Sequence, residues 1–210
     1  MIHQKNPRQG VFENDVFLTI YPEGFYSLEF YETQTSDIIR SFLVSYGKCR
    51  ARNDEVILSD YENGFKMKGV FSGDQLVIND SFRFLSGLAL KYYIAAPKLE
   101  TTRFPFDFKV DLSLARKERE NYNQHELVPL FFGEYVWADL RFWFHANDTY
   151  LLKFRDKVIL SEGTWSRNGN IMILYDIALK CRFYAFITWE ELICNQMIGS
   201  LRGSTFKYVT

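Results

Sequence analysis

Residues 163–208 read GTWSRNGNIMILYDIALKCRFYAFITWEELICNQMIGSLRGSTFKY, and residues 47–92 read GKCRARNDEVILSDYENGFKMKGVFSGDQLVINDSFRFLSGLALKY. The two stretches align over 46 positions without a gap, at an offset of 116 residues. Ten of these positions are identical, and many of the others exchange one apolar residue for another. Self-similarity at a fixed offset indicates a repeated structural unit. We therefore expect two copies of one fold in this 210-residue chain.

The repeat extends upstream of these stretches at a slightly larger offset. Tyr26 and Leu28 align with Tyr150 and Leu152 at an offset of 124 residues, which implies an eight-residue insertion in the first copy near residues 31–38. The identical pairs of the ungapped stretch include glycines, aspartates and asparagines: Gly47 and Gly163, Asp60 and Asp176, Asn79 and Asn195.

Short alternating patterns predict that each copy consists of β-strands. Apolar side chains at Val16, Leu18 and Ile20 alternate with other residues, as expected for a strand with one buried face. Asn63 and Gly64 form a favoured pair for a two-residue hairpin turn, because both residues tolerate positive φ. Aromatic residues favour strands and make up 18% of the chain. The sequence therefore predicts an all-β fold, with about six or seven strands in each copy.

The chain divides into two repeats and a connector. Residues 1–94 form the first β repeat, residues 95–128 the connector, and residues 129–210 the second β repeat. The predicted architecture is two tandem antiparallel barrel-like or sandwich-like repeats with one connecting helix. The two repeats either share a continuous sheet or form separate ones.

The connector contains one predicted strand and one predicted helix. Apolar residues alternate over residues 104–112, and Pro105 places this strand at a sheet edge, because proline cannot donate a hydrogen bond to a neighbouring strand. Residues 113–127 are rich in good helix formers and contain neither glycine nor proline. They predict the helix of the connector.

The second copy carries a short pattern that occurs in a known family. After a strand expected at residues 149–154, Gly163-Thr164-Trp165 is followed by a polar turn and by the apolar residues 171–174. This G-x-W…I-x-L pattern resembles that of bacterial lipocalin-like small β-barrels, including domains of the NlpE lipoprotein type. The first copy has Cys49 in place of the tryptophan, and the family's C-x-x-C metal motif is absent. The resemblance implies a small antiparallel barrel or sandwich, and no particular function, since such folds host many.

Charge and hydropathy argue against two classes of partner. The chain carries 25 basic and 26 acidic residues, whereas nucleic-acid binders usually carry a basic excess. No run reaches the roughly 18 apolar residues that span a bilayer. Residues 1–10 are polar, without the pattern of a signal peptide, and three cysteines without C-x-x-C spacing favour a reducing compartment. We expect a cytoplasmic protein that neither binds nucleic acid nor spans a membrane.

The cysteines are interpreted as packing residues. The other copy has large apolar residues at the positions equivalent to Cys49, Cys181 and Cys194. A buried cysteine behaves as a small hydrophobic residue. We therefore expect three unpaired and largely buried thiols; a reactive or metal-binding thiol is the alternative.

The histidines and the repeated aspartates form no recognisable catalytic constellation. His3, His125 and His145 lack the spacing of metal ligands. Asp60 and Asp176 each end a strand before a turn, where an aspartate accepts backbone hydrogen bonds; acid–base chemistry is the alternative. No catalytic or nucleotide-binding motif is found. The sequence therefore predicts neither an enzyme nor a bound metal or cofactor.

One aromatic segment provides the candidate binding surface. If residues 135–144 form a single strand, one of its faces is apolar and belongs to the core. The other face then carries Tyr135, Trp137, Asp139, Arg141 and Trp143. Tryptophan, tyrosine and arginine are enriched in binding hot spots, so this face is a candidate partner surface. The alternative is a seam against the connector or the other repeat.

Trp189 is the second candidate for contact with a partner. It aligns with Gly73, a turn position, so it should project from a hairpin tip, where it either closes a barrel end or binds a partner. Together these residues favour a non-catalytic binding protein with a protein partner, for example a cytoplasmic inhibitor or immunity-type protein. The alternative function is a carrier of a small apolar ligand inside a β-barrel.

Overall fold

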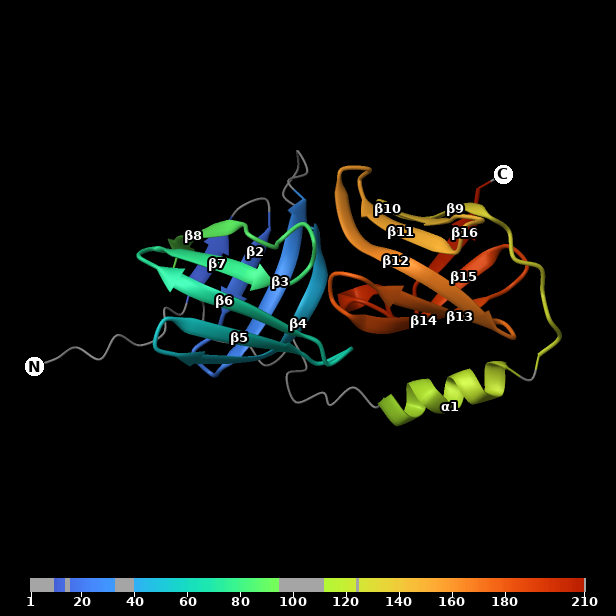
Figure 1. The fold of residues 1–210 in the computed structure, drawn as a ribbon, viewed down its shortest axis with the longest axis horizontal. Helices are drawn as coiled ribbons and strands as arrows, with labels where there is room; N and C mark the ends of the chain where they lie inside the picture. The colour runs from blue at the N-terminus through green and yellow to red at the C-terminus, as the bar shows by residue number, and fades with distance from the viewer. Residues whose placement is uncertain (1–9, 14–15, 33–39, 95–111, 124, 210) are drawn as a thin grey trace, which may run out of the picture. The chain divides into compact units, whose positions relative to one another are not determined.

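The computed structural model describes residues 10–13, 16–32, 40–94, 112–123 and 125–209. These residues form two closed β-barrels and one α-helix (Figure 1). The first barrel belongs to one compact unit of the chain, and the helix and the second barrel belong to another, which comprises Phe82–Phe84 and Asp111–Thr210. No helix in the described part of the chain is both long and apolar enough to cross a membrane.

The first barrel is an up-and-down sheet in which each strand pairs with the next one in sequence. All neighbouring strands are antiparallel, and β1 pairs with β8 to close the sheet. The eight strands are β1 (Gly10–Glu13), β2 (Phe17–Ile20), β3 (Phe25–Glu32), β4 (Arg40–Arg52), β5 (Glu55–Asp60), β6 (Lys66–Ser72), β7 (Gln75–Asp80) and β8 (Ala89–Ile94).

The second barrel has the same topology, and β16 pairs with β9 to close it. A single 3-10 turn, Gly199–Leu201, precedes its last strand. The eight strands are β9 (Gly133–Trp137), β10 (Leu140–Phe144), β11 (Thr149–Phe154), β12 (Val158–Asn168), β13 (Ile171–Asp176), β14 (Cys181–Ile187), β15 (Glu191–Gln196) and β16 (Thr205–Tyr208).

The cross-strand registers confirm the internal repeat. Gly47 pairs with Asp60 in the first barrel and Gly163 pairs with Asp176 in the second. The same offset relates the pairs of the next three ladders in each barrel. The β6–β7 ladder and its counterpart β14–β15 also share a register shift. The two repeats are therefore barrels rather than sandwiches. Each has eight strands instead of the six or seven expected, and they form two separate sheets.

A β-bulge at the same place in both copies points a serine side chain toward the barrel interior. Between β3 and β4 the register shifts after Leu28, which leaves Val44 as an extra residue. Val44 and Ser45 are both buried, although successive side chains of a regular strand point to opposite faces. The same shift between β11 and β12 buries Leu160 and Ser161. Each barrel interior thus receives a hydroxyl group.

Large side chains fill the barrel interiors. In the second barrel, the ring centroid of Phe142 lies 4.9 Å from that of Phe144, 5.6 Å from that of Tyr150 and 5.9 Å from that of Phe206. All four rings are at most 2% exposed. An eight-stranded barrel is just wide enough for its own side chains to fill. The hydrophobic side chains that are 0% exposed on the strands of the first barrel include one tyrosine, one methionine and several aliphatic residues: Tyr26, Met67, Leu18, Leu28, Val44, Val56, Leu58, Leu76, Ile78 and Leu90.

Gly47 and Gly163 occupy positions where no side chain fits. A Cβ atom at Gly47 would collide with the backbone carbonyl oxygen of Ser59 on β5. One at Gly163 would collide with that of Tyr175 on β13 and would approach the ring of Tyr150 to 3.3 Å. The close pairing of these strands therefore requires glycine, which explains why the residue recurs in both copies.

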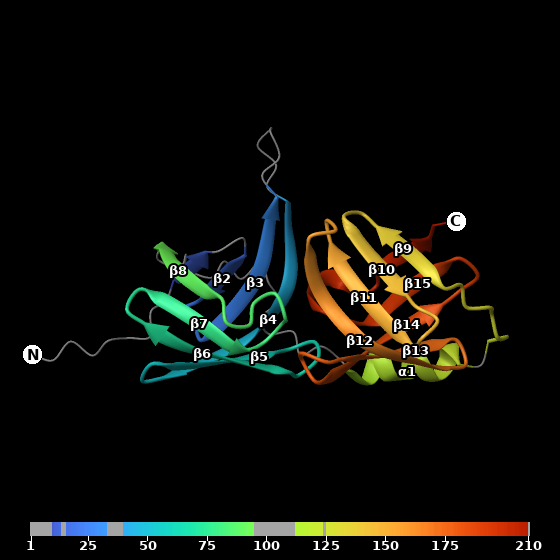
Figure 2. The ribbon, with the colours of Figure 1, turned by 45° about the horizontal axis from the view of Figure 1, so that its top comes forward.

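Helix α1 (Leu112–Tyr122) packs against an aromatic side chain on the outer surface of the second barrel. Phe186 on β14 faces outward there, at a position where the first copy has Val70. Tyr122 of the helix stacks on Phe186 with ring centroids 4.2 Å apart, and Ala115 is buried. Figure 2 shows the helix along the outside of this barrel, beside β13 and β14.

The connector differs from the sequence prediction at the end of the helix. The helix ends at Tyr122 rather than at residue 127. Asn170, in the turn between β12 and β13, donates from its side-chain amide to the carbonyl oxygen of Glu126 at 2.7 Å and accepts the N–H of Val128 at 3.0 Å. Because these hydrogen bonds hold Glu126 and Val128 against the turn, tertiary contacts outweigh the helix propensity of the residues after Tyr122. The edge strand predicted around Pro105 lies outside the described residues.

Gly47→Ala and Gly163→Ala should each lower the free energy of unfolding by about 3 kcal/mol, because backbone atoms rather than flexible side chains obstruct the added methyl group. Denaturant unfolding of the purified variants measures this loss. Gly73→Ala is the control, since nothing lies within 4 Å of the added carbon and only the positive φ of 63° is unfavourable there. It should cost about 1 kcal/mol. Equal losses in all three variants would contradict the packing argument.

Candidate functional site

The aromatic segment over residues 135–144 is a hairpin and not one strand. β9 ends at Trp137 and β10 begins at Leu140, and these two residues pair across the turn. Ala138, the first turn residue, has a φ of 50°, in the left-handed region that tight hairpin turns favour. The prediction of a continuous strand is therefore wrong. The predicted alternation of inward and outward side chains does not continue from β9 into β10.

The reversal of the chain places Tyr135 and Trp137 on the inner side of the barrel. Tyr135 is 1% exposed, packs edge-on against Phe144 with ring centroids 5.7 Å apart, and donates its hydroxyl hydrogen to the carbonyl oxygen of Phe131. Trp137 lies at the barrel rim, with its ring centroid 6.0 Å from that of the buried Phe206. The expected outer position is therefore wrong for Tyr135, whereas Trp137 is 37% exposed at the rim, as expected of an accessible side chain.

Trp143 belongs to a row of side chains across the outside of the second barrel. It pairs with Leu151 on β11 and with Glu134 on β9. The N–H of Val209 bonds to the carbonyl oxygen of Glu134 at 2.9 Å, just beyond β16. Continuing the register between β15 and β16 sets Trp189 opposite Val209. We call Leu151, Trp143, Glu134, Val209 and Trp189 the outer row.

The aromatic and aliphatic members of the outer row are open to solvent. Trp189 is 67% exposed and Val209 is 46% exposed, while Trp143 and Leu151 are half-buried. The ammonium nitrogen of Lys153 lies 5.3 Å from the ring centroid of Trp143, which covers one part of the indole. The row thus follows the outside of the closed barrel, and its two tryptophans lie three strand spacings apart around it.

Ion pairs border the outer row. Arg141 binds Oε1 of Glu134 at 2.5 Å and Oδ2 of Asp156 at 3.1 Å. Asp139, in the hairpin turn, accepts a hydrogen bond from Nε of Arg155 at 3.2 Å. Exposed ion pairs of this kind contribute little to stability. They hold Arg141 beside the row and keep Asp139 in a separate pair at the turn.

The first copy indicates that barrel formation does not require these side chains. At the positions equivalent to Trp143, Leu151 and Trp189 it has Thr19, Ser27 and Gly73. The equivalent strands nevertheless form ladders with the same register in both barrels. Packing within the barrel therefore does not account for the outer row, which makes it the candidate functional site.

A buried hydroxyl–carboxyl network is the other constellation with chemical potential. In the first barrel, the hydroxyl oxygen of Tyr26 lies 2.7 Å from Oγ of Ser45, and Ser45 donates to Oδ2 of Asp60 at 2.7 Å. Oδ1 of Asp60 accepts the N–H of Asn63 at 2.7 Å, which is the turn contact that the sequence predicts. The network links three neighbouring strands to the turn that follows them.

The second barrel repeats this network residue for residue. Tyr150 lies 2.8 Å from Oγ of Ser161, which donates to Oδ2 of Asp176 at 2.5 Å. Oδ1 of Asp176 accepts the N–H of Leu179 at 2.7 Å. The tyrosine, serine and aspartate of each network are at most 4% exposed. No substrate can reach these groups in the closed barrel, so we assign them to the fold.

The ungapped alignment begins just after the serines of the network and therefore does not include them. Ser45 and Ser161 share the 116-residue offset and lie two residues before the quoted stretches. Burial raises the pKa of the Asp60 carboxyl to about 6, against the opposing effect of the hydrogen bonds from Asn63 and Ser45. Burial also raises the pKa of Asp176. Both carboxyls thus ionise less readily than an exposed aspartate does.

The cysteines are poor candidates for nucleophiles. None of the three forms a disulfide. Cys194 is 1% exposed, which confirms its predicted burial, whereas Cys49 and Cys181 are half-buried. Burial raises the pKa of the Cys49 thiol to about 12 and that of Cys194 further. Cys49 and Cys194 are therefore protonated at neutral pH, and only a thiolate is an effective nucleophile.

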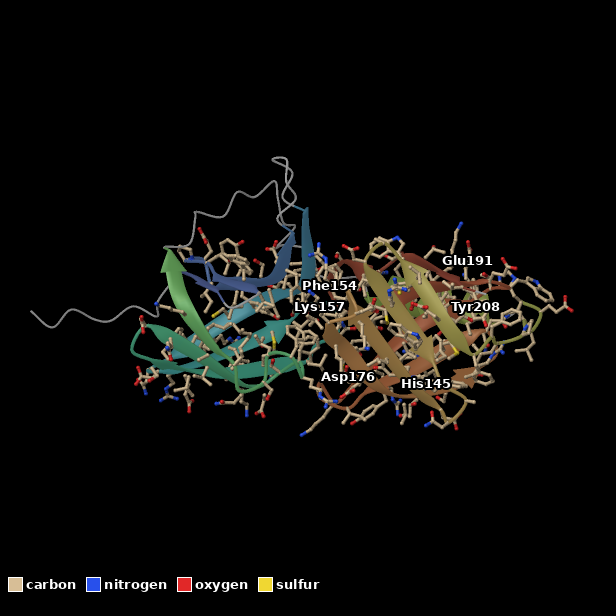
Figure 3. The ribbon with its side chains drawn as sticks, turned by 90° about the horizontal axis from the view of Figure 1, so that it is seen from above. His145, Phe154, Lys157, Asp176, Glu191 and Tyr208 are labelled. Atoms are coloured by element: carbon tan, nitrogen blue, oxygen red, sulfur yellow. The ribbon has the colours of Figure 1, made fainter. Side chains whose placement is uncertain are left out.

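The histidines lie apart from one another. His145, labelled in Figure 3, is exposed beyond the end of β10, and His125 is exposed after α1. His3 lies outside the described residues. Among the residues that the structure describes, no group of three or more histidine, cysteine, aspartate or glutamate side chains is placed to hold a metal ion.

The raised pKa of Asp60 predicts how stability depends on pH. An unfolded aspartate ionises near pH 3.9, whereas the folded Asp60 holds its proton up to about pH 6. The folded state binds more protons between these values, so the free energy of unfolding should fall as the pH rises from about 4 to 6. A shift of about two pH units corresponds to about 3 kcal/mol.

Denaturant unfolding of Asp60→Asn between pH 4 and 7 checks this dependence. The variant cannot ionise at this position, so its free energy of unfolding should fall less than that of the wild type as the pH rises from about 4 to 6. Asp74→Asn removes an exposed carboxyl in the β6–β7 turn and serves as the control that keeps it. Identical slopes for wild type and Asp60→Asn would show that Asp60 does not titrate as the structure indicates.

The G-x-W pattern lies on β12, where Trp165 closes one end of the second barrel. Its indole N–H donates to the carbonyl oxygen of His145 at 3.2 Å, and its ring centroid lies 6.0 Å from those of Phe132 and Phe144. The resemblance to lipocalin-like barrels therefore concerns a structural residue and the barrel architecture. Comparisons with protein-family models, with curated proteins and with solved structures find no match for this chain.

Proposed function

We propose that this protein is a non-catalytic binding protein, that its partner is another protein, and that the partner docks on the outer row of the second barrel. The observation that carries the proposal is that two tryptophans lie on the outside of the second barrel, the half-buried Trp143 on β10 and the 67% exposed Trp189 in the turn between β14 and β15. Tryptophan combines a large apolar area with an N–H donor and few rotatable bonds, and it is enriched among hot-spot residues.

The length of the outer row favours a protein over a small molecule. The row crosses from β11 to the start of β15, which is four strand spacings or about 19 Å. Its surface is the outside of a sheet and combines apolar side chains with the Glu134–Arg141 ion pair, a mixture of apolar and charged groups that protein interfaces also contain. Small ligands usually bind in concave pockets instead.

Two further observations favour binding over the alternatives. The interior of the second barrel is occupied by the rings of Phe142, Phe144, Tyr150 and Phe206, so no observation supports a carrier of an apolar ligand. The repeated aspartates are enclosed, and a catalytic acid or base must reach its substrate. The reaction centre of an enzyme has no counterpart among the groups described above.

Trp143→Ala and Trp189→Ala should leave the fold nearly unchanged. Each variant should lose less than about 1 kcal/mol of unfolding free energy, because surface substitutions have small effects. Phe142→Ala is the matched control, since Phe142 is adjacent to Trp143 on β10 but points into the barrel; it should lose about 3–5 kcal/mol. Denaturant unfolding gives all three values. A loss at Trp143 or Trp189 as large as that at Phe142 would mean that the row is structural.

Binding tests the function itself. The tagged full-length chain is used to purify partners from its native host, and the affinity of the partner that co-purifies is then measured. The double variant Trp143→Ala/Trp189→Ala should bind at least about 30-fold more weakly, as expected for two hot-spot residues. Ile57→Ala, which shortens an exposed apolar side chain on the first barrel, should bind normally. Unchanged affinity in the double variant would refute the assignment of the outer row.

A further inference from the structure

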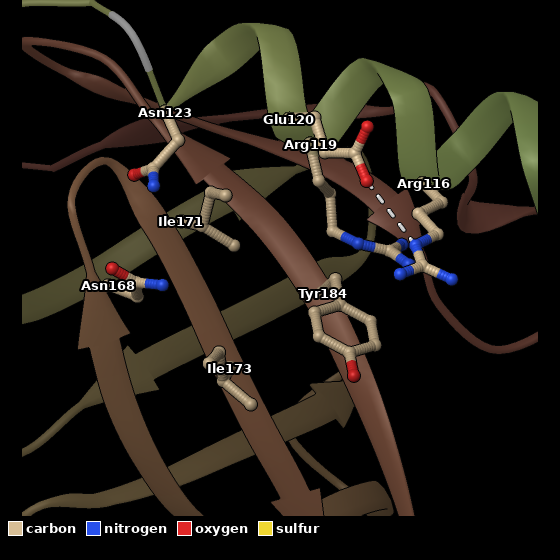
Figure 4. Close-up of a pocket in the computed structure, with 8 residues that line it drawn as sticks. All are labelled: Arg116, Arg119, Glu120, Asn123, Asn168, Ile171, Ile173 and Tyr184. Atoms are coloured by element: carbon tan, nitrogen blue, oxygen red, sulfur yellow. Dashed lines mark ion pairs between the residues drawn. The ribbon is translucent and has the colours of Figure 1, made fainter.

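A groove runs between helix α1 and the outer surface of the second barrel (Figure 4). Its volume is about 390 Å³, within the range of about 300–1,000 Å³ that is typical of ligand sites. The helix contributes Arg116, Arg119, Glu120 and Asn123, strand β12 contributes Asn168, and strands β13 and β14 contribute Ile171, Ile173 and Tyr184. The groove lies on different strands from the outer row.

The barrel side of the groove is apolar. Ile171 and Ile173 are alternate residues of β13, and Tyr184 on β14 pairs with Ile173. At the positions equivalent to Ile171 and Tyr184, the first copy has the exposed residues Glu55 and Lys68. The second copy has therefore exchanged two charged side chains for an aliphatic and an aromatic one. Ile171 is buried, whereas Ile173 and Tyr184 are half-buried and line the groove.

Arg119 places a positive charge in the groove without a carboxylate against it. Its Nη1 donates to Oδ1 of Asn195 at 2.7 Å and to Oε1 of Gln196 at 3.2 Å, and the guanidinium carbon lies 4.1 Å from the ring centroid of Tyr184. These partners are all neutral. Burial lowers the pKa of Arg119, which reflects the cost of holding this charge away from water.

Arg116 adds a second positive charge beside the first. The two arginines are three residues apart on one helix, so they lie on the same face, and Figure 4 shows their guanidinium groups next to each other above Tyr184. Nε of Arg116 pairs with Glu120 at 3.3 Å, and both side chains of this pair are largely exposed. Glu118 accepts a hydrogen bond from Asn195 at 2.8 Å and does not line the groove.

We propose that this groove binds an extended acidic segment of a protein, with one carboxylate of that segment against Arg119 and Arg116 and a neighbouring aliphatic side chain over Ile173. A carboxylate can accept two parallel hydrogen bonds from a guanidinium group, and this pairing is among the strongest polar contacts in proteins. The apolar floor specifies a peptide rather than an inorganic anion, because an inorganic anion would contact only the arginines.

The charge arrangement favours such an occupant. Glu120 pairs with Arg116 and offsets one of the two positive charges, so the three charged side chains that line the groove keep a net charge of about +1, which a carboxylate of the segment offsets. Because alternate residues of an extended chain point in opposite directions, a segment that alternates acidic and aliphatic residues presents one kind of side chain to each wall of the groove. The site is independent of the outer row, so either assignment can fail without the other.

The test uses the full chain and a defined probe, the acetylated and amidated peptide Ile-Glu-Ile-Glu-Ile. Isothermal titration calorimetry at low salt should give a dissociation constant below about 1 mM for this peptide, and at least about tenfold weaker binding for its Ile-Gln-Ile-Gln-Ile analogue. Arg119→Gln and the more exposed Arg116→Gln should each weaken binding of the acidic peptide at least about tenfold. Trp189→Ala should bind it as wild type does.

The following results would overturn the proposal. These are no binding of the acidic peptide at about 1 mM, equal binding of the glutamine analogue, or unchanged affinity in both arginine variants. Equally strong binding of acetate or inorganic phosphate would show that the groove takes small anions and not a peptide. Loss of binding in Trp189→Ala, with both arginine variants unchanged, would place the peptide on the outer row instead.

Discussion

A serine hydroxyl, turned inward by a β-bulge, ties three strands of each barrel together. In the first barrel Ser45 lies between Tyr26 on the preceding strand and Asp60 on the following one, and Asp60 accepts the N–H of Asn63 in the next turn. A buried polar group without a partner costs about 1–3 kcal/mol, so these groups stabilise only the register in which all of them are paired. The second barrel contains the same network, with the same bulge beneath it.

This shared interior leaves the outer surfaces free to differ. The two barrels have the same strand order and the same registers, yet their exposed residues have diverged. The second copy has Trp189 where the first has Gly73, and Tyr184 where the first has Lys68. One exchange contributes to the outer row and the other to the surface on which α1 packs. We infer that the duplication kept the barrel as a scaffold and that binding depends on the outside of the second copy.

The sequence predicts the fold class and the repeat because both depend on local patterns: alternation, turn residues and identities at a fixed offset. It does not predict the hairpin at Ala138, since the pattern of residues 135–144 is equally compatible with one strand, and only the paired registers place Tyr135 inside. It does not predict the inward direction of Ser45 either. A bulge shifts the alternation of inward and outward side chains along a strand, and no residue pattern shows where this bulge occurs. The end of α1 depends on Asn170, more than 40 residues away from the chain that it binds.

Site-specific photo-crosslinking tests the central claim, that the protein partner binds to the outside of the second barrel. A benzoylphenylalanine is introduced in place of Trp189, and in a second protein in place of Gly73, the equivalent hairpin position of the first barrel. Irradiation in cells of the native host should then give a discrete crosslinked protein from position 189 and none from position 73. The absence of a discrete product at position 189, or the same products from both positions, would contradict the account.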